Sequence, residues 1–133
     1  MVAALELYLD VEATRQVRGL WKALEDEGVP TRVEMDFVGQ FVGRVLWLGV
    51  VPTVDLLTHH RLVHERLTAR GVEIWDLYQP GRWVPHCTIS MRVPNPLMAT
   101  AIRRCLEVLP LPATVTGASV TDHANDIAHP LTP

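Results

Sequence analysis

The sequence lacks several features that would assign a protein to a class at once. Its two cysteines, Cys87 and Cys105, are too few for a disulfide framework and do not match a zinc motif. Its longest apolar run, residues 45–52, is too short to cross a bilayer. We expect no signal peptide, because the first five residues lead directly into a charged segment. We therefore expect a reduced, cytoplasmic protein with no membrane partner.

Positive charge is also scarce. The chain has 12 Lys and Arg against 15 Asp and Glu, a net charge of −3, so it has no overall basic field of the kind that attracts nucleic acid. All of these cations except Lys22 are arginines, which suit contacts with phosphate, although a genome-wide codon bias produces the same excess. The glycines stand singly, so no Gly-rich phosphate loop is present. Any contact with RNA must be local.

The sequence does contain an alternation of strand-like and helix-like patterns. Apolar residues recur with a period of two in some segments and at helical spacing in others. The run 45–51, apolar at every position, is typical of a central strand and is expected to form a hairpin with 33–37. We predict an α+β domain over residues 1–120, with an antiparallel or mixed sheet, about three helices and an irregular tail at 121–133. The predicted strands are 5–9, 33–37, 45–51, 72–78, 83–90 and 113–120, and the predicted helices begin after Asp10, Thr53 and Asn95.

The stretch WVPHCTIS at residues 83–90 carries the most specific chemistry. Side chains two apart on a strand share a face, which predicts His86, Thr88 and Ser90 on one face and Cys87, Ile89 and Met91 on the other, against the helices. Imidazole transfers protons near neutral pH, and a threonine hydroxyl can donate to a phosphate oxygen. A lone H-x-T also arises by chance, however, and a histidine on a strand is most often structural.

Residues around this stretch could complete a substrate site. Arg82 is placed to make a charge-assisted contact with phosphate, and Tyr78 or Trp83 to stack against a base. His60 and His64, one helical turn apart, have a spacing that can bind zinc. No H-E-x-x-H motif surrounds them, and His60 shares a helix face with Leu56, Val63 and Leu67, which favours packing in the core. We expect no metal and no cofactor.

The segment YQPGRWVPHCTI at residues 78–89 resembles the second signature of the two-histidine phosphoesterase superfamily, specifically bacterial 2′-5′ RNA ligase-like proteins. Residues 45–53, the helix around 60–64, and the opening segment 4–10 are similar to the same family. The resemblance implies two lobes, with an H-x-T/S motif from each lobe facing the other across a groove. One histidine then acts as general base and the other as general acid on a phosphodiester of a nucleotide or RNA terminus. The two hydroxyls hold the phosphate, and no metal takes part.

Carried over to this chain, the resemblance makes His86 and Thr88 the catalytic second motif. The first motif is absent, because no other histidine is followed by Thr or Ser two positions later, and residues 28–33 pass directly between the elements that would flank it. The chain is thus expected to be a shortened member with one half-site. Three classes follow: an enzyme whose second histidine comes from a homodimer or from His59, His60 or His64; a module that binds phosphate on Thr88, Ser90 and Arg82 without turnover; or a degenerate interaction protein.

Overall fold

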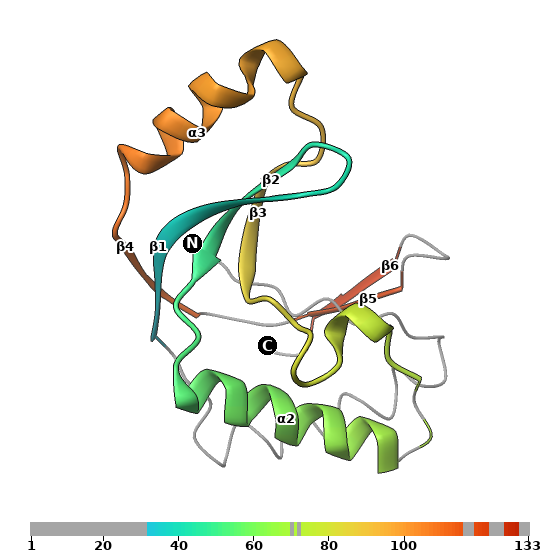
Figure 1. The fold of residues 1–133 in the computed structure, drawn as a ribbon. Coiled ribbons are helices and arrows are strands. Elements are labelled where there is room, and N and C mark those ends of the chain that lie inside the picture. Colours follow the sequence, from blue (N-terminus) through green and yellow to red (C-terminus); the bar gives the residue numbers. More distant parts are fainter. Residues whose placement is uncertain (1–31, 70, 72, 116–118, 123–126, 131–133) are drawn as a thin grey trace. The chain divides into compact units, whose positions relative to one another are not determined.

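A computed structural model describes residues 32–69, 71, 73–115, 119–122 and 127–130 (Figure 1). The predicted strand at 5–9 and the helix after Asp10 lie outside these residues. The chain divides into two compact units. One unit contains residues 32–52 and 84–114, and the other includes the described part of 53–83 and the C-terminal strands.

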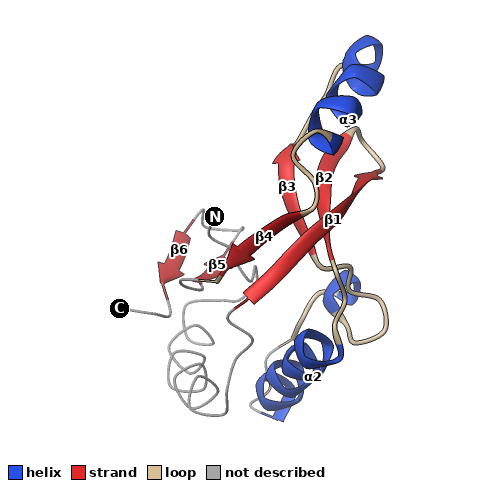
Figure 2. Ribbon diagram, turned by 90° about the vertical axis from the view of Figure 1, so that its left-hand side faces the viewer, coloured by secondary structure: helices blue, strands red, loops and turns tan. Residues whose placement is uncertain are grey.

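The first unit is built on a four-stranded antiparallel sheet (Figure 2). Its strands are β1 (Arg32–Phe41), β2 (Val45–Val50), β3 (His86–Ser90) and β4 (Leu111–Thr114), in the order β3-β2-β1-β4. β2 is a central strand and forms a hairpin with β1, as predicted. The hairpin turn contains two successive residues with positive φ, Gly43 at 92° and Arg44 at 69°. Glycine adopts this conformation without a steric penalty, which places the turn at this point of the sequence.

Two register shifts decide which side chains share a face of this sheet. On β1, Met35 pairs with Val50 and Phe37 with Gly49, so Asp36 is an extra residue. On β3, Thr88 pairs with Trp47 and Ser90 with Leu46, so Ile89 is an extra residue. A bulge of this kind reverses the alternation beyond it. Residues 35 and 37 therefore point to opposite faces, although their spacing in the sequence predicts a common one.

The two faces that result differ in composition. Directly paired residues point to the same side of a sheet, so the register defines an apolar face and a second face, which we call the His86 face. The apolar face includes Met35, Leu46, Leu48, Val50 and Cys87, and the His86 face includes Phe37, Phe41, Trp47, His86 and Thr88. Leu46 and Leu48 are each 2% exposed, which makes the apolar face the core of this unit.

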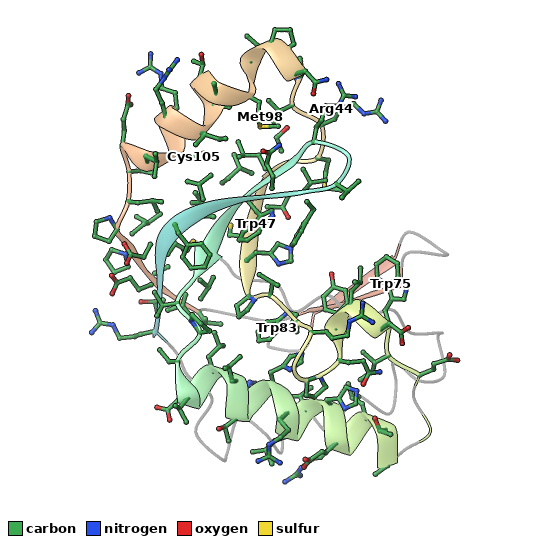
Figure 3. All side chains as sticks on the ribbon, in the orientation of Figure 1. Arg44, Trp47, Trp75, Trp83, Met98 and Cys105 are labelled. Carbon is green, nitrogen blue, oxygen red and sulfur yellow. The ribbon has the colours of Figure 1, made fainter. Side chains whose placement is uncertain are left out.

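After β3 the chain forms a short 3-10 helix, η2 (Asn95–Leu97), and then α3 (Met98–Leu106). The less exposed residues of α3 are Met98, Ala101, Ile102 and Cys105, which stand at helical spacing. Figure 3 shows Met98 and Cys105 on the side of α3 that is turned toward the sheet. The prediction that Ile89 and Met91 also face the helices is wrong: they are 51% and 71% exposed, because Ile89 occupies the bulge.

The second unit contains α2 (Val54–Ala69), which begins and ends where the sequence predicts. The Thr53 hydroxyl accepts a hydrogen bond from the Leu56 amide (3.2 Å) and caps the helix, and Gly71 follows it with a φ of 77°. The strand predicted at 72–78 is not observed over its described part, where the 3-10 helix η1 (Asp76–Tyr78) forms instead.

The C-terminal segment contains more structure than its sequence suggests. The single strand predicted at 113–120 is two strands, β4 and β5 (Ser119–Asp122), and β5 pairs with β6 (Ile127–Pro130) in an antiparallel hairpin. The tail predicted to be irregular therefore includes a strand. The predicted α+β class is confirmed, with two α-helices among the described residues.

Candidate active site

His86 is held by a hydrogen bond within its own strand segment. Its ring atom Nδ1 lies 2.6 Å from the Val84 carbonyl oxygen. A carbonyl can only accept a hydrogen bond, so Nδ1 carries the proton and Nε2 is the nitrogen with a lone pair in the neutral ring. The backbone on either side is also fixed, because the Val50 amide donates to the Pro85 carbonyl (3.1 Å) and His86 pairs with Gly49. The fold thus selects the tautomer in which Nε2 can accept a proton.

Thr88 lies on the same face as His86, as predicted. It pairs with Trp47, and Trp47 and Gly49 lie two apart on β2 in the regular part of the register. The Thr88 side chain is exposed, while His86 is half-buried. A reacting group on this face can therefore meet an imidazole nitrogen and a hydroxyl that come from one strand.

Ser90 does not belong to this pair. The sequence spacing predicts it beside His86 and Thr88, but the bulge at Ile89 pairs it with Leu46, on the apolar face of the sheet. The prediction that Ser90 shares the face of His86 is therefore wrong. Bulges often re-aim side chains next to functional sites, and here the bulge limits the polar groups of β3 on the His86 face to His86 and Thr88.

The His86 ring is packed among aromatic residues from β1 and β2. The Phe41 ring centroid lies 4.8 Å away, nearly perpendicular, and the Trp47 centroid lies 5.8 Å away. Phe41 and Trp47 contact each other at 4.9 Å, so the three rings form one cluster. Trp47 is 8% exposed, and its Nε1 is buried without a hydrogen-bond partner among the described residues. The imidazole of His86 is therefore in contact with two aromatic rings from the neighbouring strands.

Two glycines allow the aromatic rings to lie against the sheet. A Cβ at Gly39 would stand 2.1 Å from the Trp47 ring, and a Cβ at Gly49 would stand 2.0 Å from the Phe37 ring. No side chain can occupy either position while the rings stay in place. The glycines of β1 and β2 thus create the space that the aromatic residues of the His86 face require.

The other predicted substrate residues, Arg82, Tyr78 and Trp83, belong to the second unit. Arg82 is exposed. The Trp83 ring stacks on His60 with a centroid distance of 4.0 Å and an interplanar angle of 6°, and Tyr78 stacks on Trp75 at 6.2 Å. Both predicted base-stacking rings therefore have an aromatic partner within their own unit, and their contact with a substrate stays a prediction.

Two histidines of α2, His59 and His60, are buried in the second unit. His60 is 7% exposed and lies with the buried Val63 and Leu67, as its position on the helix predicts. Burial, together with the neighbouring His64, lowers the pKa of His60 to about 4, despite a hydrogen bond to the Tyr78 backbone. Burial also lowers the pKa of His59. Among the described residues, no three His, Cys, Asp or Glu side chains are grouped so that they could hold a metal ion.

Sequence reasoning missed Phe37, Phe41 and Trp47 as neighbours of His86. Phe37 and Trp47 were predicted to be strand, and Phe41 lay outside the predicted strands. Contacts across strands depend on the register, and the bulge at Asp36 reverses the face of Phe37. The combination of glycine and aromatic residues on paired strands was the available signal, because a glycine often marks a close approach of another group.

The geometry places a histidine side chain, with Nε2 as its unprotonated nitrogen, and a threonine hydroxyl on one face of a strand. The family model of the 2′-5′ RNA ligase superfamily matches residues 7–127. The chain belongs to this superfamily, and its fold is a reduced form of the two-histidine phosphoesterase fold. No curated protein and no solved structure matches the chain significantly. No described helix is long and apolar enough to cross a membrane.

Proposed function

We propose that this protein acts on a phosphodiester of a nucleotide or RNA terminus, by acid–base chemistry at His86 that requires no metal ion. Its membership of the 2′-5′ RNA ligase superfamily supports the reaction class. The observation that carries the proposal is the hydrogen bond from His86 Nδ1 to the Val84 carbonyl, because it leaves Nε2 to exchange a proton on the same face as Thr88.

On a 2′,3′-cyclic phosphate the step is a hydrolysis. Water attacks phosphorus and forms a P–O bond while His86 Nε2 accepts the proton of that water. The bond from phosphorus to one ribose oxygen breaks, and that oxygen takes up a proton from a second acid. The Thr88 hydroxyl donates to a non-bridging phosphate oxygen. In the proposal Arg82 adds a charge-assisted contact with the phosphate, in keeping with the preference of guanidinium for this group.

The second acid is the open part of the proposal. One histidine cannot accept and donate a proton in a single concerted step, and the sequence contains no other H-x-T or H-x-S. We propose that a second copy of the chain supplies it, since a two-fold axis brings two identical sites together. His59 and His60 suit the role less well, because burial lowers the pKa of each.

The absence of a second H-x-T or H-x-S motif from the sequence favours one alternative function. A chain with a single half-site can bind a nucleotide or RNA phosphate through Thr88 and Arg82 without turning it over. The two functions share the His86 face and differ only in whether the proton transfer is completed.

Turnover of adenosine 2′,3′-cyclic phosphate and of a 2′-5′-linked dinucleotide tests the proposal. We expect His86→Ala to lose about 10²- to 10⁴-fold in kcat, as is typical for a general acid–base group. Thr88→Ala should lose activity, whereas Thr114→Ala, another exposed strand threonine of the same sheet, should retain it. Binding without turnover in the wild type would favour the binding module. Turnover that survives His86→Ala would refute the assignment.

A further inference from the structure

Phe37 lies in the same cross-strand row as His86. Phe37 pairs with Gly49, and Gly49 pairs with His86 on its other side. The bulge at Asp36 brings Phe37 to this face, since without it the side chain would lie on the face of Met35. The row therefore consists of an aromatic ring, a glycine and the proposed catalytic histidine.

The Phe37 ring is positioned by its neighbours and yet is open to solvent. It lies over Gly49, where a Cβ would be 2.0 Å from it, and it meets the Trp47 ring edge-on at 6.1 Å. It is nevertheless 41% exposed, whereas Trp47 is 8% exposed. Phe41 is packed against both Trp47 and His86. Phe37 is thus the aromatic of this face that offers the most surface to a ligand.

The spacing of Phe37 and His86 fits one nucleotide. One strand, β2, lies between them, so two inter-strand spacings put their backbones about 10 Å apart. The Phe37 ring shortens this distance because it leans over the intervening Gly49. A ribose joins a base to its phosphate over a comparable length. Every base has a π-face, and stacking on an aromatic side chain is a general mode of recognition for unpaired nucleotides.

We infer that Phe37 stacks against the nucleobase of the substrate whose phosphate lies at His86 and Thr88. The inference rests on the proposed function and deepens it, because it makes the substrate a nucleoside phosphodiester and not a base-free sugar phosphate. It also assigns base recognition to the sheet that carries the catalytic strand. Tyr78 and Trp83, the stacking residues predicted from sequence, have ring partners of their own in the second unit.

Calorimetric binding to the full chain tests this assignment with two probes, adenosine 2′-monophosphate and inorganic phosphate. Phe37→Leu keeps an apolar side chain over Gly49 but removes the ring, and Phe37→Tyr keeps the ring. We expect Phe37→Leu to weaken nucleotide binding roughly 10- to 100-fold, Phe37→Tyr to bind like the wild type, and phosphate binding to stay within about twofold in both variants.

The outcomes separate this inference from the proposed function. If Phe37→Leu binds the nucleotide more weakly than the wild type does, but the wild type turns over no phosphodiester, the result would support stacking and reject catalysis. Turnover by the wild type with unchanged nucleotide affinity in Phe37→Leu would reject stacking and leave catalysis in place. If Phe37→Leu lost affinity for both probes equally, the role of Phe37 would be structural and the inference would be overturned. It would also be overturned if the wild type bound inorganic phosphate as tightly as the nucleotide.

Discussion

At the scale of single residues, the His86 face depends on glycines as much as on its aromatic and polar side chains. We expect Gly49→Ala to destabilise the protein by roughly 1–3 kcal/mol, the usual cost of forcing atoms into a packed site, since the Phe37 ring occupies the position of the new methyl group. Urea unfolding would measure this change.

Gly43→Asn is the matched control for that substitution. Gly43 has open space around it. Its φ of 92° is strained for any residue with a side chain, but asparagine is among the residues that adopt a positive φ most readily, so the unfolding midpoint of this variant should change less. An equal loss of stability in the two variants would contradict the packing described for Gly49.

His60 gives a second prediction at this scale, on the dependence of stability on pH. Its pKa in the folded state is about 4, below the ordinary value of 6.5, so the unfolded chain binds the proton more readily. The stability that His60 confers as a neutral group is therefore complete above pH 6.5 and is lost as pH falls from 6.5 toward 4. The pKa difference corresponds to about 3 kcal/mol.

Unfolding of wild type and His60→Phe between pH 4 and pH 8 checks this prediction. Phenylalanine keeps a ring against Trp83 but cannot titrate, so its stability should fall less steeply below pH 6.5. Parallel curves for the two proteins would exclude His60 as the source of the acid sensitivity.

At the scale of elements, the bulge at Ile89 determines which residues of β3 point to which face. Deletion of Ile89 should leave His86 and Thr88 opposite Gly49 and Trp47 and Ser90 opposite Leu46, because only the unpaired, exposed residue is removed. We expect this variant to fold and to keep its nucleotide binding, as circular dichroism and calorimetry would show.

Deletion of Cys87 is the corresponding control, because it removes a paired residue and turns His86 to the apolar face. It should abolish binding or folding. If deletion of Ile89 were as damaging as deletion of Cys87, the register described for β3 would be wrong.

The start of α2 gives a further prediction for a single element. Thr53→Ala removes the hydroxyl that caps the Leu56 amide, and the expected loss is about 1 kcal/mol. Thr53→Ser keeps the acceptor and should lose only a small part of that. Urea unfolding separates the two, and equal losses would mean that the cap contributes nothing.

Sequence patterns predicted these elements unevenly. α2 and α3 were found because apolar residues at helical spacing, with Thr53 and Gly71 at the ends of α2, are local signals. The faces of β1 and β3 were assigned incorrectly beyond Asp36 and Ile89, because a bulge is fixed by pairing with another strand and leaves the period of two unchanged in the sequence. The segment predicted to be a strand at 72–78 contains the 3-10 helix η1 instead, and its sequence has few local signals of secondary structure.

At the scale of the whole molecule, the sequence identified the family and predicted that His86 and Thr88 share one face of β3, because a motif and its flanks are local. It could not identify the aromatic residues around His86, which come from other strands. The sequence also did not identify a second acid, and we propose as the answer that a second copy of the chain supplies it.

Mixing wild type with His86→Ala at constant total concentration tests that answer. If each working site needs a histidine from both chains, an equal mixture with free exchange of subunits should retain roughly a quarter of the wild-type activity. If one chain suffices, it should retain about half. Sedimentation of the wild type would add an independent check, because a monomer at assay concentration cannot build a shared site.

The central claim is that His86 presents Nε2 to a phosphate while Nδ1 stays bonded to the Val84 carbonyl. The most direct measurement is nitrogen NMR of the histidine ring during titration with adenosine 2′-monophosphate, with His86→Gln to assign the signals. We predict that the singly protonated ring carries its proton at Nδ1, and that the nucleotide causes a shift confined mainly to Nε2. A singly protonated ring with its proton at Nε2, or signals that do not respond to the nucleotide, would contradict the account.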